Sequence, residues 1–349
     1  MSSAEPAVAR PAAGLDAAAL ERHLAASIRD FSGPLALTRI SGGQSNPTFF
    51  VDTPTHRLVL RKQPDGAVLP SAHAIDREYR IQAALLGRGV PVPRVMSFCS
   101  DATVIGTPFY VMERVEGRVL ADCGLGPLPK AERRHVYGEA ARMLARLHAV
   151  DWRAAGLSDY GRPDGYFERQ MARWTRQWQQ SRTRDLPAID RLLDWLPRHL
   201  PQGGVPGIVH GDYRLGNLML HPTTPRLAAV LDWELSTIGD PMADLAHFCL
   251  AWDMRVDESG GLLGLDLDAE GLPTREEVVA AYAAEGGRTE GFGLFHRVFA
   301  LFRFAVIHEG IAARAKAGNA ASDEAAQVGK LSENFAQRAV DVIAGAAAP

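Results

Sequence analysis

The chain has 349 residues, of which 46% are hydrophobic and 23% are charged, and its formal net charge is −3. This composition is typical of a globular protein with a sizeable core, in one large or two medium domains. The small net charge gives no bulk attraction to nucleic acid or to an anionic membrane surface, and no run approaches the roughly 18 apolar residues of a membrane helix. Three scattered cysteines form neither a metal-ligand spacing nor a disulfide framework, so we expect a reducing, cytoplasmic location.

The beginning of the chain predicts a disordered tail followed by a helix. Residues 1–14 are rich in Ala, Pro and Ser, a composition typical of disorder. Residues 15–28 carry apolar side chains at every fourth position, with Asp16 near their start, which favours a helix.

The next segment predicts strands on both sides of a glycine turn at residues 41–46. Its adjacent Gly42 and Gly43 would let backbone amides approach a phosphate closely, and Ser45 and Asn46 would complete the turn. A glycine pair is more often a simple hairpin turn, so this feature gains weight only from its position in the chain.

The strand after this turn ends in two cations, Arg61 and Lys62, and residues 71–86 then predict a helix. Side chains alternate between the two faces of a strand, so only one of these cations can point inward. Glu78, on the helix, is the candidate ion-pair partner of the inward cation. A solvated charge on a helix face is the simpler alternative for Glu78.

The remainder predicts one more strand and then mostly helices. Residues 108–117 have the pattern of a strand that leads into a linker, and His148 ends a long amphipathic segment as a core histidine. The expected helices cover residues 130–150, 165–200, 274–285, 292–316 and 323–345, with a Gly- and Asp-rich loop at 253–275.

Three polar side chains, Asp212, Asn217 and Asp232, stand among apolar residues in the middle of the chain. Each alone is most simply explained by turn or cap hydrogen bonds. Together they match phosphoryl transfer, which needs a carboxylate to orient the acceptor hydroxyl, hard oxygen ligands for Mg²⁺ and a cation near the moving group. Arg214, two residues after Asp212, supplies that cation.

The motifs are H-G-D-Y-R-L-G-N at residues 210–217, L-D-W-E at 231–234 and G-D-P-M-A-D-L at 239–245. In this order they resemble the aminoglycoside phosphotransferase and choline kinase-like superfamily, with Gly211 as the departure from protein kinases. The resemblance implies an α+β, bilobal, protein-kinase-like fold. It places an N-lobe with an antiparallel sheet at 15–115 and a larger, mostly helical C-lobe at 116–349, with the family domain over about 30–290.

The resemblance also implies ATP and Mg²⁺ as cofactors and a role for each site residue. Asp212 would orient the hydroxyl and accept its proton, and Arg214 would stabilise the phosphoryl charge. Asn217 and Asp232 would hold Mg²⁺, and Glu234 ranks below Asp232. Asp240 and Asp244 would brace this segment, Asp240 as a helix N-cap.

On the nucleotide side, the resemblance implies that Arg61, paired with Glu78, holds the phosphates, with Lys62 as the alternative. The glycine turn would cover the phosphates through Gly42, Gly43, Ser45 and Asn46. Adenine would contact the backbone carbonyl of Glu113 and the backbone amide of Val115.

Residues 43–48, 60–62, 69–73 and 302–319 resemble a subgroup that occurs alone or fused to acyl-CoA dehydrogenases. This subgroup implies a hydroxyacyl-CoA or hydroxy acid as the acceptor, with Arg303 and Arg314 meeting its anionic groups, and an acyl-CoA dehydrogenase acting in the same pathway. Three hypotheses stay open beside it. They are an aminoglycoside kinase that uses the acids of residues 253–277, a choline-type kinase with a cage of Trp174, Trp178 and Trp252, and a non-catalytic pseudokinase.

Overall fold

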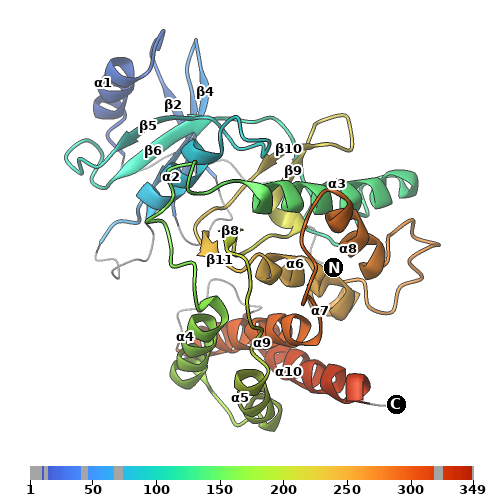
Figure 1. Cartoon of the computed structure of the whole chain (residues 1–349). Helices are drawn as coiled ribbons and strands as arrows, with labels where there is room; N and C mark the ends of the chain where they lie inside the picture. Colours follow the sequence, from blue (N-terminus) through green and yellow to red (C-terminus); the bar gives the residue numbers. More distant parts are fainter. Residues whose placement is uncertain (1–9, 12–14, 41–45, 67–73, 318–324, 348–349) are drawn as a thin grey trace. The chain divides into compact units, whose positions relative to one another are not determined.

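The computed structural model describes residues 10–11, 15–40, 46–66, 74–317 and 325–347. The chain forms two compact units, which can be followed by colour in Figure 1. The first unit contains residues 1–118, 155–157 and 219–236, and the second contains 119–154, 158–218 and 237–349. The chain therefore returns to the first unit after it has left it.

A six-stranded antiparallel sheet forms the frame of the first unit (Figure 1). Its order is β1-β2-β3-β4-β6-β5, with β1 (Arg10–Pro11), β2 (Ala36–Arg39), β3 (Thr48–Asp52), β4 (Arg57–Lys62), β5 (Val95–Cys99) and β6 (Phe109–Glu113). β4 is central, and its Leu58, Val59 and Leu60 are all buried. Arg61 therefore extends from the most enclosed strand of the sheet.

Two helices accompany this sheet, both close to the predicted positions. α1 (Ala17–Ser27) begins after Asp16, whose carboxylate accepts the backbone N–H of Ala19 at 2.9 Å. α2 (Ile75–Leu85) packs against β5 and β6 (Figure 1). Its Glu78 is 1% exposed, so this side chain lies in the interior. The predicted first turn of α2, residues 71–73, lies outside the described residues.

The returning segment, residues 219–236, completes the first unit. A three-stranded sheet of order β10-β9-β7 joins β7 (Arg118–Val119), β9 (Leu218–Leu220) and β10 (Leu227–Val230). The N–H of Val230 donates to the carbonyl of Pro91 at 2.8 Å. β10 thus delivers Asp232 to the unit that holds Arg61.

The second unit is mostly helical, as predicted. A short antiparallel pair of β8 (Gly207–Val209) and β11 (Thr237–Gly239) comes before and after the segment that contains Asp212, Asn217 and Asp232. The helices are α3 (Lys130–Ala149), α4 (Tyr166–Ser181), α5 (Pro187–Arg198), α6 (Met242–Phe248), α8 (Arg275–Ala284), α9 (Leu294–Lys316) and α10 (Ala325–Ala347). α9 and α10 lie side by side (Figure 1), and the core that they share with α4 and α5 is rich in Phe and Trp.

Two expectations need correction. Residues 1–14 were expected to be disordered, yet Arg10 and Pro11 pair with Arg39 and Thr38 as β1; the rest of that tail lies outside the described residues. The loop expected at 253–275 contains a one-turn helix, α7 (Val256–Ser259), and follows a short 3₁₀ helix, η2 (Cys249–Asp253).

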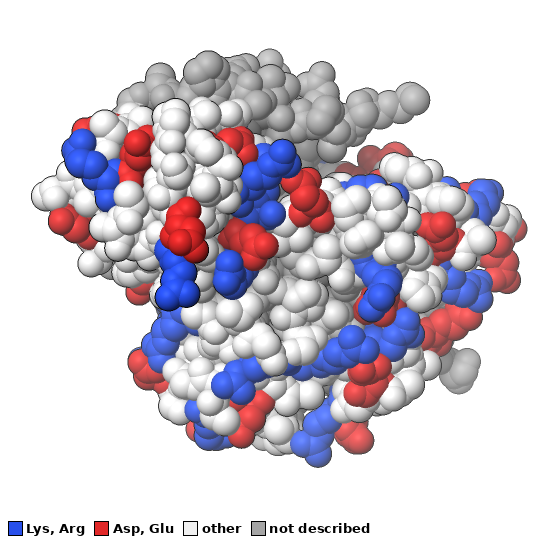
Figure 2. Space-filling view, turned by 90° about the horizontal axis from the view of Figure 1, so that it is seen from above, with Lys and Arg blue, Asp and Glu red and all other residues white. Residues whose placement is uncertain are grey.

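Basic and acidic side chains are interspersed on the face shown in Figure 2. This pattern agrees with the net charge of −3, because neither sign dominates. Among the described helices, none combines the length and the apolar composition that a membrane crossing requires.

Candidate functional site

The backbone of the loop after β8 is held from two sides by buried charged groups. The carboxylate of Asp244, which is 0% exposed, accepts the backbone N–H of His210 at 2.6 Å and that of Gly211 at 2.8 Å. The buried Arg303 on α9 donates from Nη2 to the carbonyl of Gly211 at 2.5 Å. Gly211 has φ of 88°, a conformation that favours glycine. Gly211, the residue before Asp212, is therefore held by hydrogen bonds at both its N–H and its carbonyl.

The side chain of Asp212 is also fixed, by three donors of the second unit. Oδ1 accepts from Nε2 of His247 at 2.8 Å, and Oδ2 accepts from Nδ2 of Asn217 at 2.8 Å and from Nε of Arg214 at 3.2 Å. Burial alone would raise the pKa of Asp212, but the hydrogen bond from His247 and the nearby arginines outweigh it and hold the pKa well below its usual range. The carboxylate is therefore ionised at neutral pH.

Asn217 sits at the end of a 3₁₀ turn, η1 (Leu215–Asn217), between Asp212 and β9. Its Nδ2 donates to both the carboxylate and the backbone carbonyl of Asp212, at 2.8 and 2.9 Å. Both amide protons are thereby engaged, so its side-chain oxygen is the group left for a cation.

In the first unit, Arg61 lies at the centre of a partly buried ionic cluster. Its Nε is 2.9 Å from Oε2 of Glu78, and its Nη2 is 3.2 Å from Oδ1 of Asp232 and 3.6 Å from Oε2 of Glu234. The ion pair expected between Arg61 and Glu78 is thus present. Asp232 has φ of 64°, which is strained for a residue other than glycine and is typical of functional positions.

Glu78 has two further partners that hold its carboxylate in place. Nδ2 of the buried Asn46 donates to Oε1 at 2.6 Å, and the hydroxyl of Tyr110 donates to Oε2 at 3.1 Å. Burial raises the pKa of Glu78 to about 7, although Arg61 acts in the opposite direction. Glu78 is therefore a group whose charge depends on keeping Arg61 beside it.

The donor set near Arg61 fits Mg²⁺. The side chains of Asp232 and Glu234 are 36% and 26% exposed, and their carboxylates and that of Glu78 surround one guanidinium. Among the described residues, no group of three His, Cys, Asp or Glu side chains forms a ready metal cage. Proteins usually bind Mg²⁺ through one or two carboxylates together with phosphates and water, and Asp232 and Glu234 would supply such carboxylates.

Among the residues that the structure describes, the others predicted to bind the nucleotide form no ion pair with Glu78 or Arg61. Lys62, the alternative to Arg61, is 4% exposed and pairs with Asp65 at 2.6 Å, away from Glu78. Glu113 ends β6 with an exposed side chain, and Val115 follows in the linker. Gly42, Gly43 and Ser45 lie outside the described residues.

Arg303 and Arg314, both on α9, have different surroundings. Arg303 contacts the carbonyl of Gly211 in the loop after β8, whereas Arg314 is exposed in the last turn of the helix. Eleven residues separate them, which is about 16 Å along a helix. The structure therefore brings Arg303, and not Arg314, together with Asp212.

Sequence reasoning identified the bracing aspartates but overlooked His247. Asp244 holds the loop after β8, as predicted. Asp240 accepts the backbone N–H of Met242 at 2.9 Å, but α6 begins one residue later than predicted, with Pro241 at its N-cap position. His247 follows Asp244 by three residues on α6, which places both side chains on one face. That spacing was the available signal for His247.

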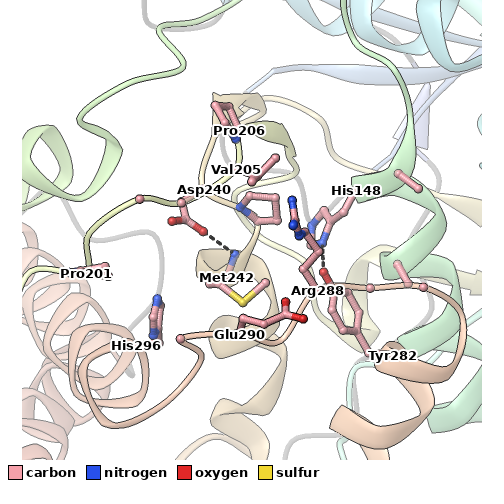
Figure 3. Close-up of a pocket in the computed structure, with 18 of the residues that line it drawn as sticks. His148, Pro201, Val205, Pro206, Asp240, Met242, Tyr282, Arg288, Glu290 and His296 are labelled. Atoms are coloured by element: carbon pink, nitrogen blue, oxygen red, sulfur yellow. Dashed lines mark hydrogen bonds between the residues drawn. The ribbon is translucent and has the colours of Figure 1, made fainter.

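A cavity of about 310 Å³ lies in the second unit, near Asp244. His148 is in its wall, where Nδ1 contacts the hydroxyl of Tyr282 at 2.8 Å (Figure 3) and Nε2 contacts Asp244 at 3.4 Å. The His148 side chain is 4% exposed, which confirms it as a core histidine. The cavity wall contains Asp240 and His296 but neither Asp212 nor Asn217.

Comparison with known proteins identifies relatives along most of the chain. The model of a family described as phosphotransferase enzymes matches residues 36–290. The chain is 42% identical over 328 residues to acyl-CoA dehydrogenase family member 10 of Mus musculus, covering 93% of this chain and 31% of that protein. It is 38% identical over 338 residues to family member 11 of Gallus gallus, covering 94% and 43%. The chain thus spans less than half the length of these curated relatives.

Two solved structures support the predicted fold class. The structure of a candidate aminoglycoside phosphotransferase from Ralstonia eutropha has a TM-score of 0.87 and 42% identity, over 95% of this chain and 99% of that one. A thermostable mutant of aminoglycoside phosphotransferase APH(4)-Ia, solved with AMP-PNP and hygromycin B, has a TM-score of 0.61 and 18% identity, over 94% and 99%. These matches confirm a kinase-like fold with an N-terminal antiparallel sheet and a mostly helical C-terminal part.

Proposed function

This chain belongs to the phosphotransferase enzyme family, and we propose that it transfers the γ-phosphoryl group of ATP to a hydroxyl group of a small molecule. The observation that carries this proposal is the ionised Asp212 carboxylate, which three side chains hold in one orientation. An ionised carboxylate only accepts hydrogen bonds, so a hydroxyl would donate to it and turn a lone pair toward phosphorus.

The transfer itself would proceed in line. The bond from the acceptor oxygen to phosphorus forms while the bond between phosphorus and the ADP oxygen breaks, and the hydroxyl proton passes to Asp212 late in the step. Arg214, whose side chain is 52% exposed beside Asp212, would stabilise the charge of the moving group. Most of the acceleration would come from positioning and electrostatics.

On the nucleotide side, Arg61 would contact the α- and β-phosphates while Glu78 holds its guanidinium. Asn217 and Asp232 would hold Mg²⁺, which neutralises phosphate charge when bound. Gly42, Gly43 and Ser45 would cover the phosphates. Asn46 would act through its hydrogen bond to Glu78. The backbone of Glu113 and Val115 would bind adenine.

The proposed division of labour follows the predicted lobes, with nucleotide binding in residues 15–115 and acceptor binding in 116–349. Asp232 is the exception, because it groups with the first unit. The family domain would then cover about residues 30–290, and the helices after it would complete the acceptor side.

A polycationic acceptor such as an aminoglycoside is disfavoured because arginines engage most of the acids of residues 253–277. Asp253 lies within 3.0 Å of Arg275 and Arg297, and Glu258 pairs with Arg338 at 2.6 Å. Further pairs at 2.7 to 2.9 Å join Asp268 and Glu277 to Arg134 and Glu270 to Arg133. Their charge is therefore already compensated.

A choline cage is disfavoured by the places of the tryptophans. Arginines 173 and 303 lie 5.3 and 5.4 Å from the ring of Trp174, so cations of the chain already occupy its surroundings. Trp252 packs against Tyr137 and donates to the carbonyl of Pro273 at 3.0 Å.

The presence of Asp212, Asn217 and Asp232 counts against a pseudokinase.

We therefore favour an anionic hydroxyl acceptor, a hydroxyacyl-CoA or a related hydroxy acid. Arg303 supplies positive charge close to Asp212, and its buried Nε has no hydrogen-bond partner among the described residues. Arg314 would meet a more distant anionic group. The relatives named as acyl-CoA dehydrogenase family members suggest that a dehydrogenase of acyl-CoA thioesters acts in the same pathway.

The test is ADP release from Mg-ATP with hydroxyacyl-CoAs, free hydroxy acids, aminoglycosides and choline. We compare the wild type with Asp212→Asn, and with Asp190→Asn as an exposed-aspartate control on α5. Turnover with an acyl-CoA that Asp212→Asn abolishes and Asp190→Asn retains would support the full proposal. Turnover only with an aminoglycoside or choline would overturn the acceptor class. ATP binding without any acceptor-stimulated turnover would favour the pseudokinase hypothesis.

A further inference from the structure

The two oxygens of the Asp212 carboxylate are held differently. A carboxylate offers about four acceptor positions, two on each oxygen. Oδ2 uses both of its positions, for Asn217 and Arg214, whereas Oδ1 accepts only from His247 at 2.8 Å among the residues that the structure describes. Oδ1 therefore keeps one open position, and His247 is the side chain that orients this oxygen.

The contacts of His247 assign its proton to Nε2. Asn217 and Arg214 both donate to Asp212, as they do to a carboxylate that only accepts, so Nε2 of His247 is the donor of the hydrogen bond to Oδ1. Nδ1 is buried and has no hydrogen-bond partner in the described part of the chain. A buried lone pair without a partner is tolerated more readily than a buried N–H, so Nδ1 carries no proton.

The electrostatic surroundings agree with a neutral imidazole. Burial is the largest influence on His247, followed by the hydrogen bond with Asp212, which acts in the opposite direction, and by the positive charge of Arg303. Together they lower the pKa of His247 below its ordinary value. A ring that stays neutral keeps Nε2 as a donor and Nδ1 as an unprotonated nitrogen.

α6 holds both parts of the catalytic loop. Asp244, on its first turn, accepts two backbone N–H groups of the loop, and His247, three residues later, contacts the side chain of Asp212. The His247 ring is 5% exposed and packs against Phe304, with ring centroids 6.1 Å apart. One short helix thus fixes the peptide before Asp212 and one oxygen of its carboxylate.

We propose that His247 is a positioning residue whose Nε2–H fixes Oδ1 of Asp212, so that the open position on this oxygen receives the hydroxyl of the acceptor. This inference rests on the proposed phosphoryl transfer. Arg214 and Asn217 constrain only the other oxygen, and Arg214 is half exposed, so neither replaces His247.

The first test compares His247→Leu with His247→Gln, because the Gln amide keeps an N–H donor near the place of Nε2. We expect His247→Leu to lower kcat by about 10- to 100-fold, the cost of a misplaced reacting group, with KM for ATP and acceptor within about twofold of wild type. His247→Gln should restore most of kcat. Unchanged kcat in His247→Leu would overturn the proposal.

The matched control is His308→Leu. His308 is also 5% exposed and packs against Phe304, but its Nδ1 contacts the carbonyl of Phe304 on its own helix. The control should lose thermal stability and keep kcat. An equal loss of kcat in both leucine variants would show a merely structural effect and overturn the proposal.

A double-mutant cycle tests the coupling directly. In an Asp212→Asn background, His247→Leu should lower the residual kcat by less than about twofold, because both changes remove the same arrangement. Independent, multiplicative losses would contradict the proposed role.

NMR of protein labelled with ¹⁵N in its histidines provides a readout that needs no acceptor. We expect the His247 resonances of a neutral ring with a proton on Nε2, and a shift of the Nε2–H signal in Asp212→Asn. A proton on Nδ1 would overturn the proposal. If wild type transfers phosphate to no acceptor while these NMR signals appear as expected, the proposed function fails, and the role of His247 in transfer fails with it, although the contact itself stands.

Discussion

Replacing Asp244 by alanine tests whether one buried carboxylate holds the loop after β8. Asp244 is 0% exposed and accepts two backbone N–H groups at 2.6 and 2.8 Å, with Nε2 of His148 at 3.4 Å. Burial alone would raise the pKa of Asp244, but the hydrogen bond and positive charge of His148 outweigh it, so the pKa is lowered. The Asp244 carboxylate is therefore charged in the folded protein, and both of its oxygens accept hydrogen bonds.

The expected cost follows from the groups that the substitution leaves behind. Asp244→Ala strands two buried N–H groups, of His210 and Gly211, at about 1–3 kcal/mol each. The substitution also removes the contact with His148 at 3.4 Å, so we expect a total loss of about 3–5 kcal/mol in the free energy of unfolding. Asp244→Asn keeps one acceptor oxygen and should lose roughly half as much.

Urea unfolding followed by circular dichroism measures this loss, with Asp240→Ala as the matched control. Asp240 lies four residues earlier and accepts a single N–H, that of Met242, so its loss should be about 1 kcal/mol, as for a helix cap. If Asp244→Ala costs no more than Asp240→Ala, the two backbone hydrogen bonds are not the support described above.

The pH dependence of the same variant gives the sign of the charge effect. The pKa of Asp244 is lower in the folded protein than the value of about 3.9 in an unfolded chain. Its contribution is therefore complete above that unfolded value and is lost as pH falls through the folded pKa. Asp244→Ala should lose less stability on acidification than wild type does.

Two further substitutions test other buried carboxylates. Burial raises the pKa of Glu78 to about 7, so the folded protein keeps a proton that the unfolded chain releases near pH 4.3. The stability of the wild type relative to Glu78→Gln should therefore fall as pH rises from about 5 to 7. A difference in urea unfolding that does not change with pH would contradict this. Glu309, which is 0% exposed, accepts from the backbone and hydroxyl of Thr183 and from Arg184 at 2.7 to 3.0 Å; Glu309→Ala should cost about 2–4 kcal/mol, and a melting temperature equal to that of wild type would refute it.

The helices could be predicted closely because their signals are local. The recurrence of apolar residues every third or fourth position defined α3 and α9 to within two residues. Strand alternation likewise predicted that only one of Arg61 and Lys62 would point inward, and in the structure Arg61 is the one that meets Glu78. In both cases the prediction depends on the geometry of a single helix or strand.

The parts that were not predicted depend on partners far away in the chain. β1 exists because Arg10 and Pro11 find an edge at Thr38 and Arg39, and a two-residue strand has no pattern of its own. The contact of His247 with Asp212 spans 35 residues, so composition around His247 cannot reveal it.

The same limit applies to charge. Composition counted the acids of residues 253–277 as an available negative surface for a cationic acceptor. Arginines from α3, α8, α9 and α10 engage most of them, and only the fold brings these arginines close. Counting charges in a loop therefore predicts less than knowing which of them are paired.

The return of residues 219–236 to the first unit has a consequence for dissecting this protein. A fragment ending at residue 118 would lack β9, β10 and Asp232, and so would lose two strands of its smaller sheet and one acidic partner of Arg61. The first unit therefore cannot be produced by simple truncation. A split at this point would require the two fragments to recombine before Arg61 regained Asp232, which makes their reassociation a direct readout of that ion pair.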